Sequence, residues 1–130
     1  MSRKLPNYQE KQRVLYIKRP SQTDLIAYGD AFLEVGKISD AIEFYQQGNY
    51  AEGLEKIKGM ALQSGDVMLL QQVVKPLRQS IPDETWNAIA QRAVELKKYL
   101  FALYAFERSN NESMVAMVKE MIKSEDNPKH

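Results

Sequence analysis

The chain has 130 residues, a length that a single hydrophobic core usually serves. Hydrophobic residues make up 44% and charged residues 27%, while 18 Lys and Arg against 17 Asp and Glu create no whole-chain field that would attract nucleic acid or an acidic membrane. Cysteine is absent, which excludes disulfides, cysteine-zinc sites and thiol catalysis. No run approaches the roughly 18 apolar residues of a membrane span or forms a signal-peptide core, so we expect a cytoplasmic protein.

The first twenty residues differ in charge from the rest of the chain. They carry six basic residues, and Glu10 is their only acidic one; the basic residues are Arg3, Lys4, Lys11, Arg13, Lys18 and Arg19. Prolines at positions 6 and 20 bracket this stretch, so we predict a basic N-terminal arm, residues 1–20, that is separable from the fold. Within it, residues 14–17 (Val-Leu-Tyr-Ile) fit a short helix, an extended piece or a binding segment, and periodicity over four residues does not decide.

From Ser21 onward the sequence predicts helices joined by short breaks. Capping residues, glycines and apolar spacing place them at residues 21–36, 38–48, 50–63, 66–79, 83–96, 99–108 and 110–123. Pro76 should kink or end the fourth of these, because it lacks a backbone donor. No segment alternates as a strand does. We therefore expect an all-α domain over residues 21–124, followed by a frayed tail over 125–130.

Small and aromatic residues recur along these helices at similar intervals. Residues 25–48 resemble a tetratricopeptide repeat, and the matching positions are Leu25, Tyr28, Gly29, Phe32, Ala41, Tyr45 and Gly48. A second unit is weaker: it has Leu54, Ile57, Ala61 and Gly65 in place, but Leu70 fills the slot of Ala41. A third unit recovers the pattern with Trp86, Ile89, Ala90, Ala93, Ala102 and Phe106.

The resemblance implies about three antiparallel helix pairs stacked as a short tetratricopeptide-like solenoid. A last helix with Met114, Met117, Val118 and Met121 would cap its end. The core would include Tyr28, Phe32, Tyr45, Trp86 and Phe106, whereas Phe44, Tyr50, Tyr99 and Tyr104 are less constrained. The alternative is an irregular bundle of seven helices whose spacing agrees by chance.

Few residues offer catalytic chemistry. His130 is the only histidine, the carboxylates are scattered, and no glycine-rich phosphate loop is present. We therefore expect no catalytic residues, no metal site and no cofactor, and we predict that the protein is not an enzyme. An enzyme subunit completed by a partner is the third and least favoured class.

The resemblance places the first helix of each pair on a concave face. The residues that would line this groove and bind a partner are Ile26, Asp30, Leu33, Glu34, Glu55, Leu62, Asn87 and Gln91. The groove mixes apolar and acidic groups and lacks the Lys/Asn/Arg set with which some family members hold a C-terminal carboxylate. We therefore predict a protein-interaction module whose partner is a protein or peptide with basic and apolar character.

The basic arm allows two further uses. It could add salt-dependent affinity for an anionic partner, so the alternative function is a helical nucleic-acid-associated or regulatory protein. Nucleic acid is the less favoured partner, because the six basic residues are interspersed with polar and apolar ones. The arm could also occupy a groove of its own chain, as self-inhibition, or of a second copy, as a homodimer.

Overall fold

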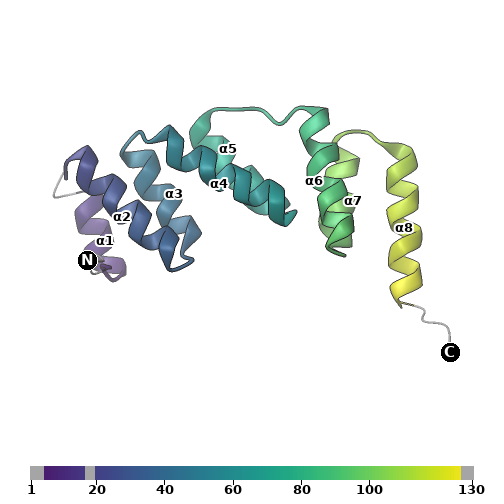
Figure 1. The fold of residues 1–130 in the computed structure, drawn as a ribbon, viewed down its shortest axis with the longest axis horizontal. Coiled ribbons are helices and arrows are strands. Elements are labelled where there is room, and N and C mark those ends of the chain that lie inside the picture. The colour runs from purple at the N-terminus through teal and green to yellow at the C-terminus, as the bar shows by residue number, and fades with distance from the viewer. Residues whose placement is uncertain (1–4, 17–19, 127–130) are drawn as a thin grey trace. The chain divides into compact units, whose positions relative to one another are not determined.

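The structure is a computed structural model that describes residues 5–16 and 20–126. Every regular element in these ranges is an α-helix (Figure 1). The helices are α1 (Tyr8–Tyr16), α2 (Gln22–Glu34), α3 (Ile38–Gln47), α4 (Ala51–Ser64), α5 (Val67–Leu77), α6 (Asp83–Glu95), α7 (Tyr99–Arg108) and α8 (Glu112–Asp126). The prediction of an all-α fold is confirmed.

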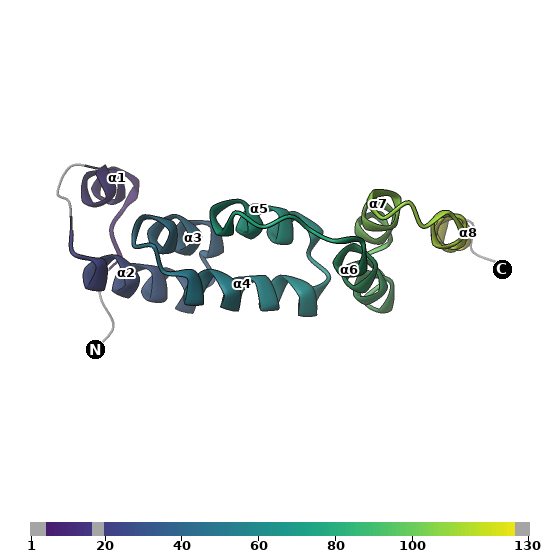
Figure 2. The same cartoon turned by 90° about the horizontal axis from the view of Figure 1, so that it is seen from above.

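The chain divides into two compact units, Met1–Ile57 and Lys58–His130, and the division falls inside α4. The domain boundary expected at residue 20 stays a prediction. Residues 8–16 form α1, whose Val14 and Leu15 are buried, so the arm contributes apolar residues to the first unit. Figure 2 shows α1 beside α3, on the same side of α2. The helical region also extends past residue 124, to Asp126, while residues 17–19 and 127–130 lie outside the described part of the chain.

Local capping explains where several helices begin. The Ser21 hydroxyl accepts a hydrogen bond from the backbone N–H of Asp24, as the sequence predicts, and the Asp66 carboxylate accepts one from the backbone N–H of Leu69. Asn7 caps the start of α1, because its side-chain oxygen accepts from the Glu10 N–H (2.8 Å) and its side-chain amide donates to the Glu10 carboxylate (3.3 Å). This reciprocal cap favours a helix at residues 8–16.

The ends of α2 to α7 share one backbone motif. A residue with positive φ follows each helix: Gly36, Asn49, Gly65, Arg78, Lys97 and Asn110. The N–H of the next residue bonds the carbonyl five positions earlier, as in Lys37 to Phe32 and Lys98 to Ala93, which is the Schellman motif. Thirteen positions separate the two motifs of each hairpin, from 36 to 49, from 65 to 78 and from 97 to 110. The second helices of the three hairpins are therefore nearly equal in length, with ten, eleven and ten residues.

The first unit is built around Tyr45, which is only 1% exposed. A Cβ added to Gly29 on α2 would lie 2.5 Å from a Tyr45 ring carbon, and one added to Gly53 on α4 would lie 2.8 Å from that ring. Two glycines thus leave the space that the ring fills. The close approach at Gly29 is therefore between the α2 backbone and a side chain of α3.

A second aromatic group lies between α2 and α3. The ring of Phe44 stacks on Phe32 (centroids 5.4 Å apart) and on Tyr28 (5.3 Å). Phe44 is fully buried, whereas Tyr28 is half-buried. The other predicted core aromatics, Phe32, Tyr45, Trp86 and Phe106, are buried as expected.

The second unit joins the end of α4 to α6 and α7. Gly65 has φ +63°, and an added Cβ would lie 2.9 Å from the Cα of Ala93, so the α4–α5 turn contacts α6 closely. Beside it, the Arg92 guanidinium donates to the Gln63 carbonyl and the Lys98 ammonium to the Ser64 carbonyl. These cations satisfy carbonyls that the helix end leaves unpaired. Further along, α7 packs against both α6 and α8.

Candidate functional site

The groove residues predicted in the first unit lie mainly on α2. Ile26, Asp30, Leu33 and Glu34 follow intervals of four, three and one residues, which place them on one side of the helix. Ile26 and Leu33 are half-buried, while Asp30 and Glu34 are exposed. Glu55 is exposed on the first half of α4. The structure therefore gathers four predicted residues into an apolar and acidic face of α2.

Asp30 also has a structural contact, because its carboxylate accepts a hydrogen bond from the buried hydroxyl of Tyr45. Burial, together with this bond, raises the pKa of Tyr45 well above its ordinary value near 10. The nearby Tyr50 hydroxyl donates to Glu52, and this bond raises the pKa of Tyr50. Asp30 thus anchors the core tyrosine as well as contributing negative charge to the face.

A pH dependence follows from Tyr45. The unfolded chain loses the Tyr45 proton above about pH 10, whereas the folded chain retains it, so the free energy of unfolding falls as pH rises through that value. We expect the Tyr45→Phe variant to show a smaller loss of urea resistance between about pH 8 and 11 than the parent protein. The ion pairs of Lys11 weaken with pH in both proteins and cancel in the comparison. Equal losses in the two proteins would contradict the assignment.

The groove residues predicted in the second unit have different environments. Leu62 on α4 is half-buried and Gln91 on α6 is exposed. Asn87 has a structural role: its side-chain oxygen accepts hydrogen bonds from the Ser109 hydroxyl (2.6 Å) and the Asn111 amide (3.2 Å). It thereby fastens α6 to the turn between α7 and α8. A groove that unites all eight residues stays a prediction.

A hollow of about 610 Å³ lies in the second unit, between the start of α7 and the last turns of α8. Leu100, Phe101 and Ile122 supply apolar surface, and the remaining lining residues are Lys97, Lys98, Tyr99 and Glu125. Leu100 is 74% exposed. We call this site the α7–α8 hollow. This hollow was not predicted from the sequence, although the three large apolar residues in a row at 99–101 were a signal, because one helix cannot bury three consecutive side chains on a single face.

An aromatic and polar cluster joins α5 and α7 beside Trp86. Gln71 and Arg108 both donate hydrogen bonds to the Tyr104 hydroxyl, and these bonds lower the pKa of Tyr104. The Arg108 guanidinium also lies over the Tyr104 ring, 4.8 Å from its centroid, and Trp86 meets that ring edge-on. These contacts fix Tyr104 in place.

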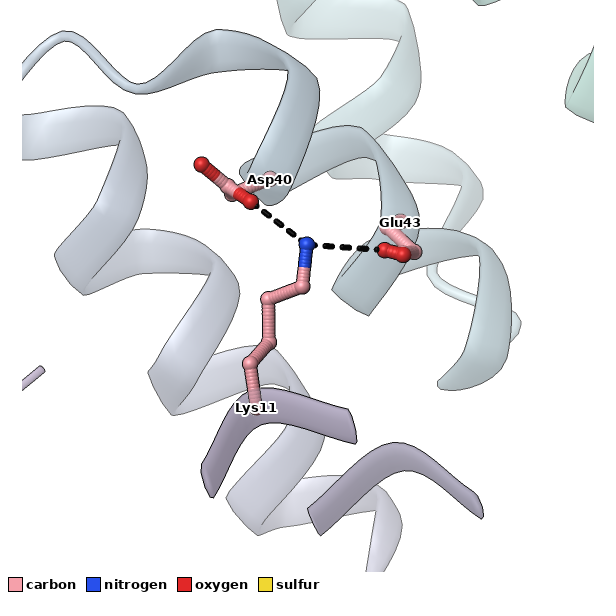
Figure 3. A network of polar contacts seen from close by, with 3 residues as sticks. All are labelled: Lys11, Asp40 and Glu43. Carbon is pink, nitrogen blue, oxygen red and sulfur yellow. Dashed lines mark hydrogen bonds and ion pairs between the residues drawn. The ribbon is translucent and has the colours of Figure 1, made fainter. Parts of the chain in front are cut away.

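The first helix is attached to α3 by an ion-pair cluster (Figure 3). The Lys11 ammonium lies 2.7 Å from the Asp40 carboxylate and 3.1 Å from that of Glu43, and the Lys11 side chain is 11% exposed. Burial lowers the pKa of Lys11, but its hydrogen bonds and ion pairs with the two carboxylates outweigh that effect and raise it overall. The acidic pair belongs to α3 and lies outside the predicted groove.

Residues 5–16 and 20–126 hold no cluster of three or more His, Cys, Asp or Glu side chains arranged for a metal ion. Their buried side-chain polar atoms all have hydrogen-bond partners. No helix in these ranges combines the length and apolar character needed to cross a membrane. Compared with protein-family models, curated proteins and solved structures, the chain finds no significant match.

Proposed function

We propose that the protein is an interaction module that binds a segment of another protein without bond chemistry. The α7–α8 hollow is the observation that carries this proposal. An exposed leucine beside Phe101 and Ile122, in a recess large enough for several side chains, is typical of a surface that a partner covers. Burying one leucine side chain contributes about 1.5–3 kcal/mol to such binding.

The charge at the rim indicates what the hollow binds. Lys97 and Lys98 line it together with one carboxylate, Glu125, so the lining carries a net positive charge. An amphipathic helix with acidic residues beside its apolar stripe complements this surface, because opposite charges raise the association rate and the specificity. The acidic face of α2 would suit the basic and apolar partner predicted from the sequence.

The helical hairpins support a tetratricopeptide-like scaffold for this function. Their second helices end at matching intervals, and Gly29 and Ala41 stand where the repeat favours small residues. Ala41 is completely buried, as a close helix contact requires. Rigid hairpins of this kind present binding surfaces with little cost in conformational entropy.

A substitution in the hollow tests the proposed function. We expect a synthetic amphipathic helix with a leucine stripe and glutamate flanks to bind the full-length protein, and the Leu100→Asp variant to bind it at least tenfold more weakly, because the variant adds a negative charge and removes apolar area. Fluorescence anisotropy of the labelled peptide measures both affinities. Met68→Asp is the matched control, since Met68 is also exposed, on α5, and does not line the hollow.

The same binding measurement also shows whether the hollow is wrong as the binding site. A lysine-flanked version of the peptide should bind more weakly than the glutamate-flanked one. Equal affinity of the parent protein and Leu100→Asp, or no binding at millimolar peptide, would remove the hollow as the binding site.

The alternative function, nucleic-acid association through the basic arm, has less support. Lys11 is paired with two carboxylates of the same chain, so it has no free charge for a phosphate group. A nucleic-acid site would also require affinity to fall steeply with salt concentration.

A further inference from the structure

The surface that α1 covers resembles a binding site with an occupant in place. We call this surface of α2 and α3, including Asp40 and Glu43, the α1 seat. Three residues of α1 turn toward it: Lys11 pairs with both carboxylates, and Val14 and Leu15 are buried. They follow intervals of three and one, which put them on one face of the helix. The seat therefore binds a helix in which a lysine is followed, three and four positions later, by two apolar residues.

The opposite side of α1 faces solvent. On that side Gln9, Arg13 and Tyr16 are exposed, and the exposed fraction of Tyr16 is 56%. A nine-residue helix such as Tyr8–Tyr16 is marginal in water, so α1 depends on the seat for its helical structure. Only two of its side chains are buried. Loss of α1 would leave the α2–α3 pair with its own aromatic core.

We propose that the α1 seat is a second binding surface, specific for a basic amphipathic helix of a partner protein, and that α1 occupies it in cis until such a helix displaces it. The charge of the seat supports this choice of partner. Two carboxylates converge on one ammonium, and removing that cation would leave them facing each other without compensation. An acidic or uncharged helix could not replace α1 at this position.

Occupation in cis makes the seat selective. A tethered helix competes at a high effective concentration, so a partner helix must bind more tightly than α1 or be present in excess. The apparent dissociation constant of the partner rises in inverse proportion to the fraction of seats that α1 leaves empty. The N-terminal arm would thus set the minimum affinity or concentration at which a partner helix occupies the seat. This inference concerns α2 and α3 and does not depend on the α7–α8 hollow.

A competition experiment tests the proposal in the full-length protein. The probe is a fluorescently labelled peptide with the sequence of residues 5–20. We expect it to bind the parent protein weakly and to bind the Leu15→Asp variant, whose own α1 no longer fits, at least tenfold more tightly. Combining Leu15→Asp with Asp40→Asn and Glu43→Gln should abolish the gain. A peptide with glutamate in place of its lysines and arginines is the control and should not bind.

Hydrogen exchange of the parent protein gives a second measurement that needs no variant. If α1 can dissociate from the seat while α2 and α3 stay folded, the amides of Val14 and Leu15 exchange at least tenfold faster than those of Phe32 and Ile42. Adding the unlabelled peptide should accelerate α1 exchange further.

Three results would overturn the proposal. The first is equal peptide affinity in the parent and Leu15→Asp proteins, and the second is α1 exchange as slow as that of α2 and α3. The third is a dimer with exchanged α1 helices in the parent protein at micromolar concentration, which would make a second copy, and not a foreign helix, the occupant of the seat.

Discussion

Replacing Gly29 with alanine is expected to destabilise the protein by about 1–3 kcal/mol, in the manner of an overpacked core. The new methyl group would lie 2.5 and 2.6 Å from two carbons of the Tyr45 ring, closer than non-bonded carbon atoms approach. The ring cannot move aside, because Gly53 holds its other edge equally closely. Urea denaturation followed by circular dichroism measures the change.

Gly59→Ala is the matched control for this substitution. Gly59 lies inside α4, and an added Cβ would meet no atom within 4 Å. Alanine should therefore stabilise the protein by about 0.5–1 kcal/mol, because it has the higher helix propensity. The two glycine substitutions thus have opposite predicted signs. Stabilisation by Gly29→Ala would show that Tyr45 does not pack between α2 and α4.

Truncating Phe44 should have the largest effect of all. Phe44→Ala is expected to cost about 3–5 kcal/mol, because a fully buried ring that stacks on Tyr28 and Phe32 leaves a cavity when it is removed. Thermal and urea unfolding would both report it. Tyr16→Ala, at a 56% exposed position, should change stability by less than about 0.5 kcal/mol. A small effect of Phe44→Ala would contradict the packing of α2 on α3.

The helix boundaries could be predicted from the sequence because their causes are local. Ser21 and Asp66 cap the backbone a few positions away, and Gly36 and Gly65 adopt the positive φ that ends a helix. Positive φ at Arg78 gave no such signal, since an arginine rarely adopts this conformation. There, Pro76 and the break at residues 80–83 marked the helix end.

Burial was harder to predict, because it depends on neighbours that are distant in sequence. Phe44 and Tyr45 are adjacent, and an amphipathic stripe has room for only one of them. Both are buried, since Phe44 meets α2 aromatics and Tyr45 fits between Gly29 and Gly53. For α1, the capping pair Asn7 and Glu10 was visible in the sequence, but the ion pairs of Lys11 with α3 join positions about thirty residues apart and left no local pattern.

The candidate sites also differ in whether they could be predicted from the sequence. The α2 face could be predicted because its four residues share one helix. The α7–α8 hollow requires the beginning of one helix and the end of another to be adjacent, and only the fold brings Leu100 near Ile122. The resemblance to a known repeat points to first helices, whereas Leu100 lies on the second helix of the last hairpin and Ile122 lies on α8.

The most direct test of the central claim is an amide chemical-shift titration of the full-length protein with the glutamate-flanked amphipathic peptide. We expect the shifts to cluster at Tyr99, Leu100, Phe101 and Ile122 and to disappear in Leu100→Asp. Shifts confined to the α2 face, or no shifts at millimolar peptide, would contradict the claim that the α7–α8 hollow is a protein-binding surface.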